Sequence, residues 1–199
     1  MVDEADQPFT FLRRGILFII SAPSGAGKTT LSRQILERVP DLRLSISYTT
    51  RAPRAGEVEG RDYHFVSADY FLRLRAGGAF AEWAEVHGQR YGTLRREVEP
   101  YRDRGIGVIL DIDVQGAAAV RRQCPDSVLV FLRASSMEAY ERRLRQRGTE
   151  DERALERRLA AAQQELACAH LYDDQVINDD LDTAVRELHA LIKHQFGDR

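Results

Sequence analysis

The chain has 199 residues, of which 43% are hydrophobic, and this length and composition predict one domain with a substantial core. Positive and negative side chains nearly cancel, to a formal net charge of −2, which argues against a global attraction to nucleic acid or to an anionic membrane. We therefore expect any cationic site to be local.

Residues 1–14 begin with acidic side chains and lack the basic and apolar regions of a secretory signal, so we interpret them as a loosely held tail. The longest apolar run, residues 15–22, is far shorter than the about 20 residues of a membrane-spanning helix. Cys124 and Cys168 lack the spacing of a zinc site or a disulfide framework, and we expect free thiols in a reducing cytoplasm.

Four short apolar segments, rich in β-branched or bulky residues and bounded by Gly, Pro, Asn or Asp, predict buried strands. They span residues 15–22, 107–113, 127–134 and 175–179. Three segments with apolar residues at helical spacing predict amphipathic helices. They span residues 28–39, 155–171 and 181–196. This alternation predicts an α/β domain with a mainly parallel sheet covered on both faces, and such sheets bind ligands beyond the carboxyl ends of their strands.

Two intervals interrupt the alternation. Residues 45–95 are rich in Arg, Glu, Gly and Tyr with little continuous strand signal, and residues 133–158 combine many arginines with many acids. We find no internal repeat and no low-complexity linker. Both intervals therefore indicate insertions on one core domain, of the kind that carry binding and closure.

The first predicted strand runs into the sequence SAPSGAGKTT and then into a helix. Lys28 is placed here although the chain has 27 arginines and, besides Lys28, only Lys193 as a second lysine. Small residues at such a turn direct backbone N–H groups into a concavity at a helix N-terminus, which suits a polyphosphate. Lysine reaches the β- and γ-phosphates and the Thr29 hydroxyl suits Mg²⁺.

This segment follows the Walker A pattern G-x-x-x-x-G-K-[ST], except that Ala22 stands at the first glycine position. Gly25 and Gly27 keep the positions where a positive φ is needed. The residues predicted to cradle the phosphates of ATP are Ala22, Pro23, Ser24, Gly25, Ala26, Gly27, Lys28, Thr29 and Thr30.

Residues 45–67 present Arg51 and Arg54, three positions apart, followed by Tyr63. Two guanidinium groups and a phenol can hold one phosphate by charge-assisted hydrogen bonds. At the end of the strand 107–113, Asp111 and Asp113 would share one face if the strand continued through both. Asp111 is our candidate for Mg²⁺, directly or through water, because hard cations take oxygen ligands; a strand that simply ends in acids is the alternative.

Residues 49–65 carry the spacing T-T-R-x₂-R-x₂-E-x₂-G-x₂-Y-x-F, which resembles the signature of the guanylate kinases without a mismatch. The segments SAPSGAGKTT, EWAEVHGQRYGT, ILDIDVQG, RQRGTEDE and INDDL extend the similarity over about residues 15–195. The resemblance implies a three-layer P-loop NTPase fold in a single domain. Its parts would be a core of residues 15–44, 96–132 and 159–199, a GMP-binding insertion of about 45–95 and a helical lid of about 133–158.

The resemblance also implies the roles of individual residues. Those matching the family's positions for the GMP phosphate are Arg51, Arg54, Tyr63 and Tyr91, and those around guanine and its ribose are Ser47, Glu82, Thr93 and Asp113. Guanine offers N1–H and N2–H₂ on one edge, so a carboxylate such as Glu82 can accept both bonds while Thr93 donates to O6. Spacing alone does not choose between Glu82 and Glu85, and the family pattern selects Glu82. Without it, Tyr63 and Tyr91 could equally be core aromatics.

By the same resemblance, the catalytic residues would be Lys28, Arg51, Arg143, Arg147 and Arg158, and Asn178 would touch the adenine of ATP. The alternative for the lid is structural, because Glu138 with Arg142 and Glu141 with Arg145 stand at i,i+4 on one helix face.

The expected reaction is MgATP + GMP = ADP + GDP, with dGMP as a further expected acceptor, in purine nucleotide metabolism. The expected partners are these nucleotides and Mg²⁺, with neither nucleic acid nor membrane, and the chain would act as a monomer or homodimer. A phosphopeptide-binding scaffold module and a P-loop enzyme with another acceptor are the alternatives, and GMP-dependent release of ADP distinguishes them.

Overall fold

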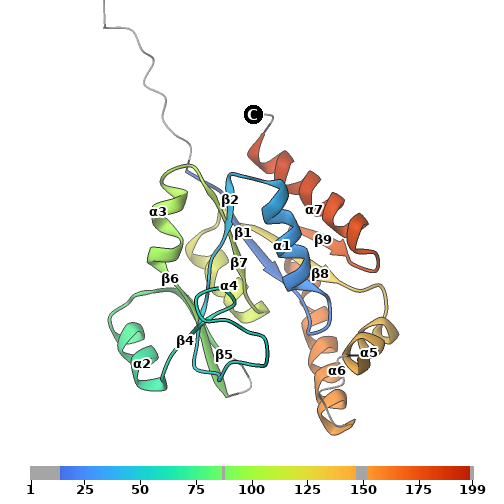
Figure 1. Ribbon diagram of the computed structural model, residues 1–199. Helices are drawn as coiled ribbons and strands as arrows, with labels where there is room; N and C mark the ends of the chain where they lie inside the picture. The colour runs from blue at the N-terminus through green and yellow to red at the C-terminus, as the bar shows by residue number, and fades with distance from the viewer. Residues whose placement is uncertain (1–13, 87, 147–151, 198–199) are drawn as a thin grey trace, which may run out of the picture.

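The computed structural model describes residues 14–86, 88–146 and 152–197 (Figure 1), so the predicted tail lies outside it except for Arg14. The main sheet has five strands in the order β2-β7-β1-β8-β9, and every neighbouring pair is parallel. These strands are β1 (Leu17–Ser21), β2 (Leu42–Leu44), β7 (Gly107–Asp111), β8 (Val128–Arg133) and β9 (Asp174–Ile177). The predicted parallel α/β architecture is confirmed. The three-residue strand β2 had no signal in the sequence analysis.

Helices cover both faces of this sheet, as Figure 1 shows. In β1, Phe18 and Ile20 pack in a cluster with α1 and α7, whereas Leu17 and Ile19 pack in a second cluster with α4 and the region of α3. The helices are α1 (Lys28–Arg38), α3 (Glu99–Arg102), α4 (Val114–Gln123) and α7 (Leu181–Phe196). Burial on both faces explains why the central strands β1, β7 and β8 have continuous apolar sequences rather than alternating ones.

A second sheet, with the order β4-β3-β6-β5, lies within the interval 45–95. Its elements are β3 (Tyr48–Thr49), β4 (His64–Phe65), α2 (Ala68–Ala76), β5 (Phe80–Val86) and β6 (Gln89–Leu94). Phe71 of α2 stacks on Phe80 of β5, with ring centroids 4.4 Å apart, and forms a small core of its own. The sequence analysis predicted an insertion here but not its strands, because two-residue strands carry no periodic pattern.

Two helices follow β8, namely α5 (Met137–Gln146) and α6 (Glu152–Leu166), and Figure 1 shows them on the opposite side of the molecule from α2. Helix α6 runs without a break through residue 158, where we placed the boundary between lid and core. The helix predicted over 155–171 ends at Leu166, and a separate 3₁₀ turn covers Ala169–Leu171. A further 3₁₀ turn covers Arg95–Glu97.

Strand β7 ends at Asp111, two residues earlier than predicted. Asp113 is instead the N-cap of α4, and its Oδ1 accepts a hydrogen bond of 2.8 Å from the Gly116 N–H. The condition under which Asp111 and Asp113 would share a strand face is therefore not met, because capping of the next helix competes with strand extension.

The start of β1 is locked to the end of α3. Gly15 N–H donates to the Arg102 carbonyl at 2.6 Å, and the buried Arg102 Nε donates back to the Gly15 carbonyl at 2.7 Å. A Cβ on Gly15 would lie 1.9 Å from the carbonyl oxygen of Ile106. Only glycine therefore allows this close backbone approach.

Within the part of the chain that the structure describes, no helix has both the length and the apolar character needed to cross a bilayer. Cys124 and Cys168 are both free thiols, as predicted.

Candidate active site

The loop after β1 forms the predicted cradle. Gly25 and Gly27 have φ values of 95° and 88°, and Gly27 is the N-cap of α1, so both glycines stand where a positive φ is required. Asn178, which follows β9, is buried and donates from Nδ2 to the Ala26 carbonyl at 2.7 Å. A Cβ on Gly27 would lie 2.5 Å from that Nδ2. The loop is therefore braced from behind by the residue that we predicted to contact adenine.

Lys28 projects from the first turn of α1 toward the end of β7. Its Nζ forms an ion pair with Asp111 and donates to the Ile112 carbonyl at 3.4 Å. About four-fifths of both charged side chains is shielded from solvent, at 21% and 22% exposure. The interaction between them is therefore stronger than in a surface ion pair, and it fixes the ammonium group at the carboxyl ends of β1 and β7.

Arg51 and Arg54 are organised by a carboxylate to which the sequence analysis gave no role. Glu57 accepts hydrogen bonds from Nη1 and Nη2 of Arg51, at 2.9 and 2.8 Å, and from the Arg54 backbone N–H at 2.7 Å. The hydrogen bond to Glu57 raises the pKa of Arg51, and a hydrogen bond to Tyr91 adds to the effect. The position of Glu57 within the quoted signature, three residues after Arg54, was the signal that could have identified it.

The two predicted tyrosines lie together beside Arg51. The rings of Tyr63 and Tyr91 meet edge to face with centroids 6.0 Å apart, and the Arg51 guanidinium lies 5.4 Å from the Tyr63 ring centroid. Burial raises the pKa of Tyr63 well above its ordinary value, and the nearby Asp111 carboxylate adds to this. Tyr63 is therefore a neutral hydrogen-bond donor at physiological pH, lining the cavity rather than the apolar core.

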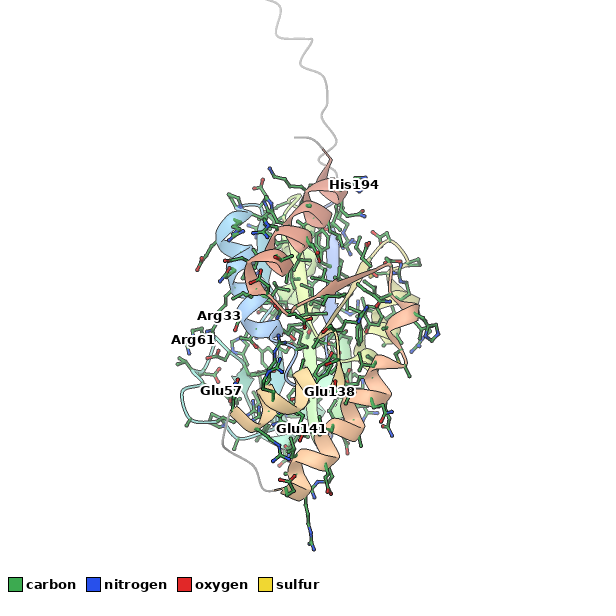
Figure 2. The ribbon with its side chains drawn as sticks, turned by 90° about the vertical axis from the view of Figure 1, so that its right-hand side faces the viewer. Arg33, Glu57, Arg61, Glu138, Glu141 and His194 are labelled. Carbon is green, nitrogen blue, oxygen red and sulfur yellow. The ribbon has the colours of Figure 1, made fainter. Side chains whose placement is uncertain are left out.

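The insertion is attached to the core through Asp62. Its Oδ1 accepts a bond of 2.7 Å from Arg33 of α1, and its Oδ2 accepts one of 2.8 Å from the neighbouring Arg61. Figure 2 shows Arg33 and Arg61 next to each other at one edge of the molecule, with Glu57 close by. This contact links the helix of the phosphate cradle to the loop that carries the two arginines.

Glu82 of β5 is 5% exposed, and its Oε1 has no hydrogen-bond partner among the described residues. Burial raises the pKa of Glu82 to about 7; the hydrogen bond from Thr93 opposes this rise and the Asp113 charge adds to it. Thr93 and Ser47 lie 3.3 Å apart, hydroxyl to hydroxyl. Glu85, in contrast, is exposed and lies 3.7 Å from Arg90, outside the cavity. The structure therefore separates the two glutamates that spacing alone left equivalent.

One cavity of about 510 Å³ brings these groups together, and a second of about 290 Å³ adjoins it. The residues that line both are Thr29, Ser47, Arg54, Tyr63, Tyr91 and Asp111. Ala22, Ser24, Lys28, Glu82, Asp113 and Arg158 line the larger one, and Arg51 lines the smaller one. The cradle and the arginine and tyrosine cluster therefore face a shared space of a size typical for small-molecule sites.

Other predicted residues lie outside this space. Pro23, Gly25 and Ala26 are buried in the loop, Thr30 is exposed on α1, and Thr93 lies beneath the cavity surface. Arg143 donates a hydrogen bond to the carbonyl of Asn178, whose side chain in turn donates to Ala26 of the cradle. Arg143 therefore supports the cradle indirectly. Arg147 lies outside the described residues.

Of the two i,i+4 ion pairs that the structural alternative expected in the lid, the described residues form the pair of Glu141 with Arg145 but not that of Glu138 with Arg142. Arg145 pairs with Glu141 of the same helix at 2.9 Å and with Glu152 of α6 at 2.7 Å. Arg158, and Arg157 beside it, line the large cavity. Arg157 was not predicted, although its position next to Arg158 in the sequence could have suggested it.

Thr29 and Asp111 supply oxygen donors to both cavities. Within the described residues, no group of three or more His, Cys, Asp or Glu side chains is placed to hold a metal. A cation at this position would therefore complete its shell with phosphate oxygens and water, which is the binding mode of Mg²⁺ rather than of a metal held in an all-protein cage. The donor set fits Mg²⁺.

Comparisons with known proteins agree with this arrangement. Residues 14–195 match the family model described as guanylate kinase. The chain is 51% identical over 180 residues to the guanylate kinase of Syntrophotalea carbinolica, covering 90% of this chain and 86% of that protein. It is 50% identical over 182 residues to that of Rubrobacter xylanophilus, covering 92% and 95%. The crystal structure of guanylate kinase from Anaplasma phagocytophilum superposes with a TM-score of 0.80 at 30% identity, covering 95% of this chain and 90% of that one.

Proposed function

This chain belongs to the guanylate kinase family, and from that membership we propose how its residues transfer a phosphoryl group from ATP to GMP. The observation that carries the proposal is the buried Glu82, which lines the same cavity as Lys28 and the Arg54, Tyr63 and Tyr91 cluster. Its Oε1 has no hydrogen-bond partner among the described residues. A base-recognition group and two phosphate-recognition groups share one space there. That combination suits a nucleoside monophosphate beside a nucleoside triphosphate.

We assign guanine recognition to Glu82. The carboxylate accepts hydrogen bonds from N1–H and N2–H₂ of guanine, while Ser47 and Thr93 supply hydroxyl groups next to it. Adenine lacks those donors and would leave a buried carboxylate unpaired. Sites that hydrogen-bond a substrate group in this way reject an analogue without it by roughly 10⁴–10⁵.

We assign the phosphate of the acceptor to Arg51, Arg54, Tyr63 and Tyr91. Glu57 holds the Arg51 guanidinium in a fixed orientation, so little freedom is lost when a phosphate binds. The neutral Tyr63 hydroxyl donates a hydrogen bond to this phosphate. A phosphate monoester has a second pKa of about 6, so its oxygen is already ionised at neutral pH and needs no general base.

We assign catalysis to positioning and charge neutralisation. Lys28 stands where the cradle meets the acceptor site, and Arg158 faces the same cavity from α6. These cations stabilise the negative charge that spreads over the transferred group, while alignment of the two nucleotides allows in-line attack. Arg143 and Asn178 act from behind the cradle, and we retain a role of Arg147 and an adenine contact of Asn178 as proposals.

Thr29 and Asp111 are the residues that would hold Mg²⁺. When bound, the ion would neutralise charge on the β- and γ-phosphates. Lys28 forms an ion pair with Asp111, so the Lys28 ammonium group and an Mg²⁺ ion held by Asp111 would act on the same phosphates.

The test is a coupled assay of ADP release with ATP and each of GMP, dGMP, AMP, CMP and UMP as acceptor. We expect release with GMP, weaker release with dGMP, and none above background with AMP, CMP or UMP. Turnover with AMP equal to that with GMP would refute the assignment of Glu82, and no turnover with any acceptor would favour a binding module.

A further inference from the structure

Helix α6 presents one continuous face to the large cavity. The residues of this face are Ala154, Arg157, Arg158, Ala161, Ala162 and Glu165. They recur at intervals of three and four positions, as one side of an α-helix requires. The face is cationic toward the helix N-terminus, small in the middle and acidic at Glu165. A ligand along it would place an anionic group near the arginines and a hydrogen-bond donor near Glu165.

Glu165 is a half-buried carboxyl group with no hydrogen bond or ion pair to its side chain among the described residues. Burial raises the pKa of Glu165 to about 7; the Lys28 charge opposes the rise and the Asp113 charge adds to it. The group is therefore partly dehydrated without a donor of its own to replace water. A bound ligand with hydroxyl donors would supply what the protein does not.

The other carboxylates lining this part of the cavity are already engaged. Asp111 pairs with Lys28, and Asp113 accepts the capping bond from Gly116. Glu82 is directed at the base in the proposed function. Glu165 is the remaining acidic side chain among the described lining residues.

Glu165 lines the cavity within electrostatic reach of Asp113, which is assigned to the base side, and of Lys28, which is assigned to the phosphates. A Cβ on Gly116 would lie 3.0 Å from Glu82 Oε2 and 3.2 Å from Asp113 Oδ1, so these two carboxylates are adjacent. Asp113 acts electrostatically on both Glu82 and Glu165, and Lys28 acts on Glu165 from the side of the cradle. In a bound nucleotide, the group between base and phosphate is the sugar.

We propose that the Glu165 carboxylate accepts hydrogen bonds from the ribose hydroxyls of the acceptor nucleotide and so makes the site prefer ribonucleotides over deoxyribonucleotides. This inference rests on the proposed function, in which that acceptor is GMP. The two oxygens of a carboxylate match the two neighbouring hydroxyls of a ribose, whereas a 2′-deoxyribose offers one. The repulsion between Glu165 and a phosphate excludes the opposite orientation of the ligand.

The experiment compares GMP with dGMP in the wild-type chain and in Glu165→Gln. Hydrogen bonds to charged groups are worth a factor of about 10 to 100 in affinity. We expect the wild type to favour GMP over dGMP in kcat/KM by at least about tenfold, and the variant to lose most of that ratio through a lower value for GMP. The value for dGMP should change much less.

Glu156→Gln is the matched control, because Glu156 lies on the exposed side of the same helix and outside the cavity. It should keep the wild-type ratio. The two phosphoryl donors ATP and 2′-deoxy-ATP report on the ribose of the donor nucleotide. Glu165→Gln should leave the ratio of their kcat/KM values unchanged.

An equal fall of kcat/KM for GMP and dGMP would overturn the inference and show that Glu165 acts on Lys28 instead. A changed ratio for the two donors would overturn it as well. If the wild type released no ADP, the proposed function would fail, and calorimetric binding of guanosine and 2′-deoxyguanosine to both forms would still decide the role of Glu165. Equal affinities of the wild type for the two nucleosides would contradict it.

Discussion

At the scale of single residues, the strongest sequence signal is Lys28, one of two lysines in a chain with 27 arginines. The structure places Lys28 in the shared cavity, with its ammonium group on Asp111, and leaves the other lysine, Lys193, exposed on α7. A compact ammonium on a flexible stem can follow a moving phosphoryl group, which a planar guanidinium does less well. The residue type at position 28 is thus explained by the chemistry of the cavity.

We predict that Lys28→Ala lowers kcat by about 100- to 1,000-fold, the range found when one preorganised donor to a developing charge is removed. Affinity for GMP should change little, because the groups assigned to GMP lie elsewhere in the cavity. Steady-state kinetics and calorimetric titration of GMP measure the two effects. Lys193→Ala is the matched control and should behave as the wild type, and turnover of Lys28→Ala equal to that of the wild type would refute the role of Lys28.

Residue roles that depend on motif spacing could be predicted, and those that depend on tertiary contacts could not. The signature identified Arg51, Arg54 and Tyr63, and the structure brings them together. The signature contains Glu57 but does not show its two hydrogen bonds to Arg51, and no pattern predicts that Asn178 donates to the Ala26 carbonyl. These bonds depend on side-chain geometry across loops. Glu165 escaped notice for the same reason, since the charges that act on it belong to Lys28 of α1 and to Asp113, the N-cap of α4.

At the scale of elements, the fit between the start of β1 and the end of α3 depends on Gly15. We predict that Gly15→Ala lowers the free energy of unfolding by about 3 kcal/mol, because a methyl group 1.9 Å from a backbone oxygen must displace the main chain. Urea denaturation followed by circular dichroism measures the change.

Gly77→Ala serves as the control for that substitution. Gly77 ends α2 with a φ of −78°, and its added Cβ would meet backbone oxygens at 3.5 and 3.7 Å, which are ordinary contacts. Its effect should stay within about 0.5 kcal/mol. If the two variants unfolded at the same urea concentration, the close approach at Gly15 would not explain the need for glycine there.

Elements with a continuous apolar signal were predicted well, and elements stabilised by their neighbours were not. Four of the five strands in the main sheet were found. Three of them, β1, β7 and β8, are buried on both faces, whereas β9 lies at the sheet edge and buries only Val176. Strands β3 and β4 have two residues each and exist through pairing with β6 or with each other, so local sequence carries no trace of them. The early end of β7 reflects a capping bond, which no apolar pattern encodes.

At the scale of the whole molecule, the large cavity is built by segments from the cradle, the insertion, the end of β7 and α6. Its formation therefore requires the complete fold, and its buried polar groups lower the stability of that fold. Glu82 is the clearest case, because it is a buried acid with an oxygen that has no hydrogen-bond partner in the described part of the chain. Functional sites commonly hold such groups at the expense of stability.

The pKa of Glu82 determines the direction of its effect. In the folded chain the pKa is raised to about 7, against 4.5 as the ordinary value, so the folded state holds a proton that the unfolded state has lost between these two pH values. The stabilisation of the folded state by this bound proton is therefore fully present below about pH 4.5 and is lost as the pH rises through about 7. A difference of this size between the folded and unfolded pKa corresponds to somewhat more than about 3 kcal/mol in total.

We predict that Glu82→Gln removes this pH dependence, because an amide has no proton to lose. The free energy of unfolding of the variant, relative to the wild type, should rise by about 2–3 kcal/mol between pH 4.5 and pH 8, as measured by urea denaturation at both values. Glu85→Gln, on the exposed side of the same strand, should follow the wild type. Glu82→Gln should also follow the wild type if the Glu82 carboxyl were well solvated.

Glu82→Gln should also bind GMP about 10- to 100-fold more weakly at pH 8, because an amide presents a donor where guanine needs an acceptor. A gain in stability coupled to a loss of affinity at one atom would show that the fold tolerates the unpaired oxygen because the nucleotide completes it.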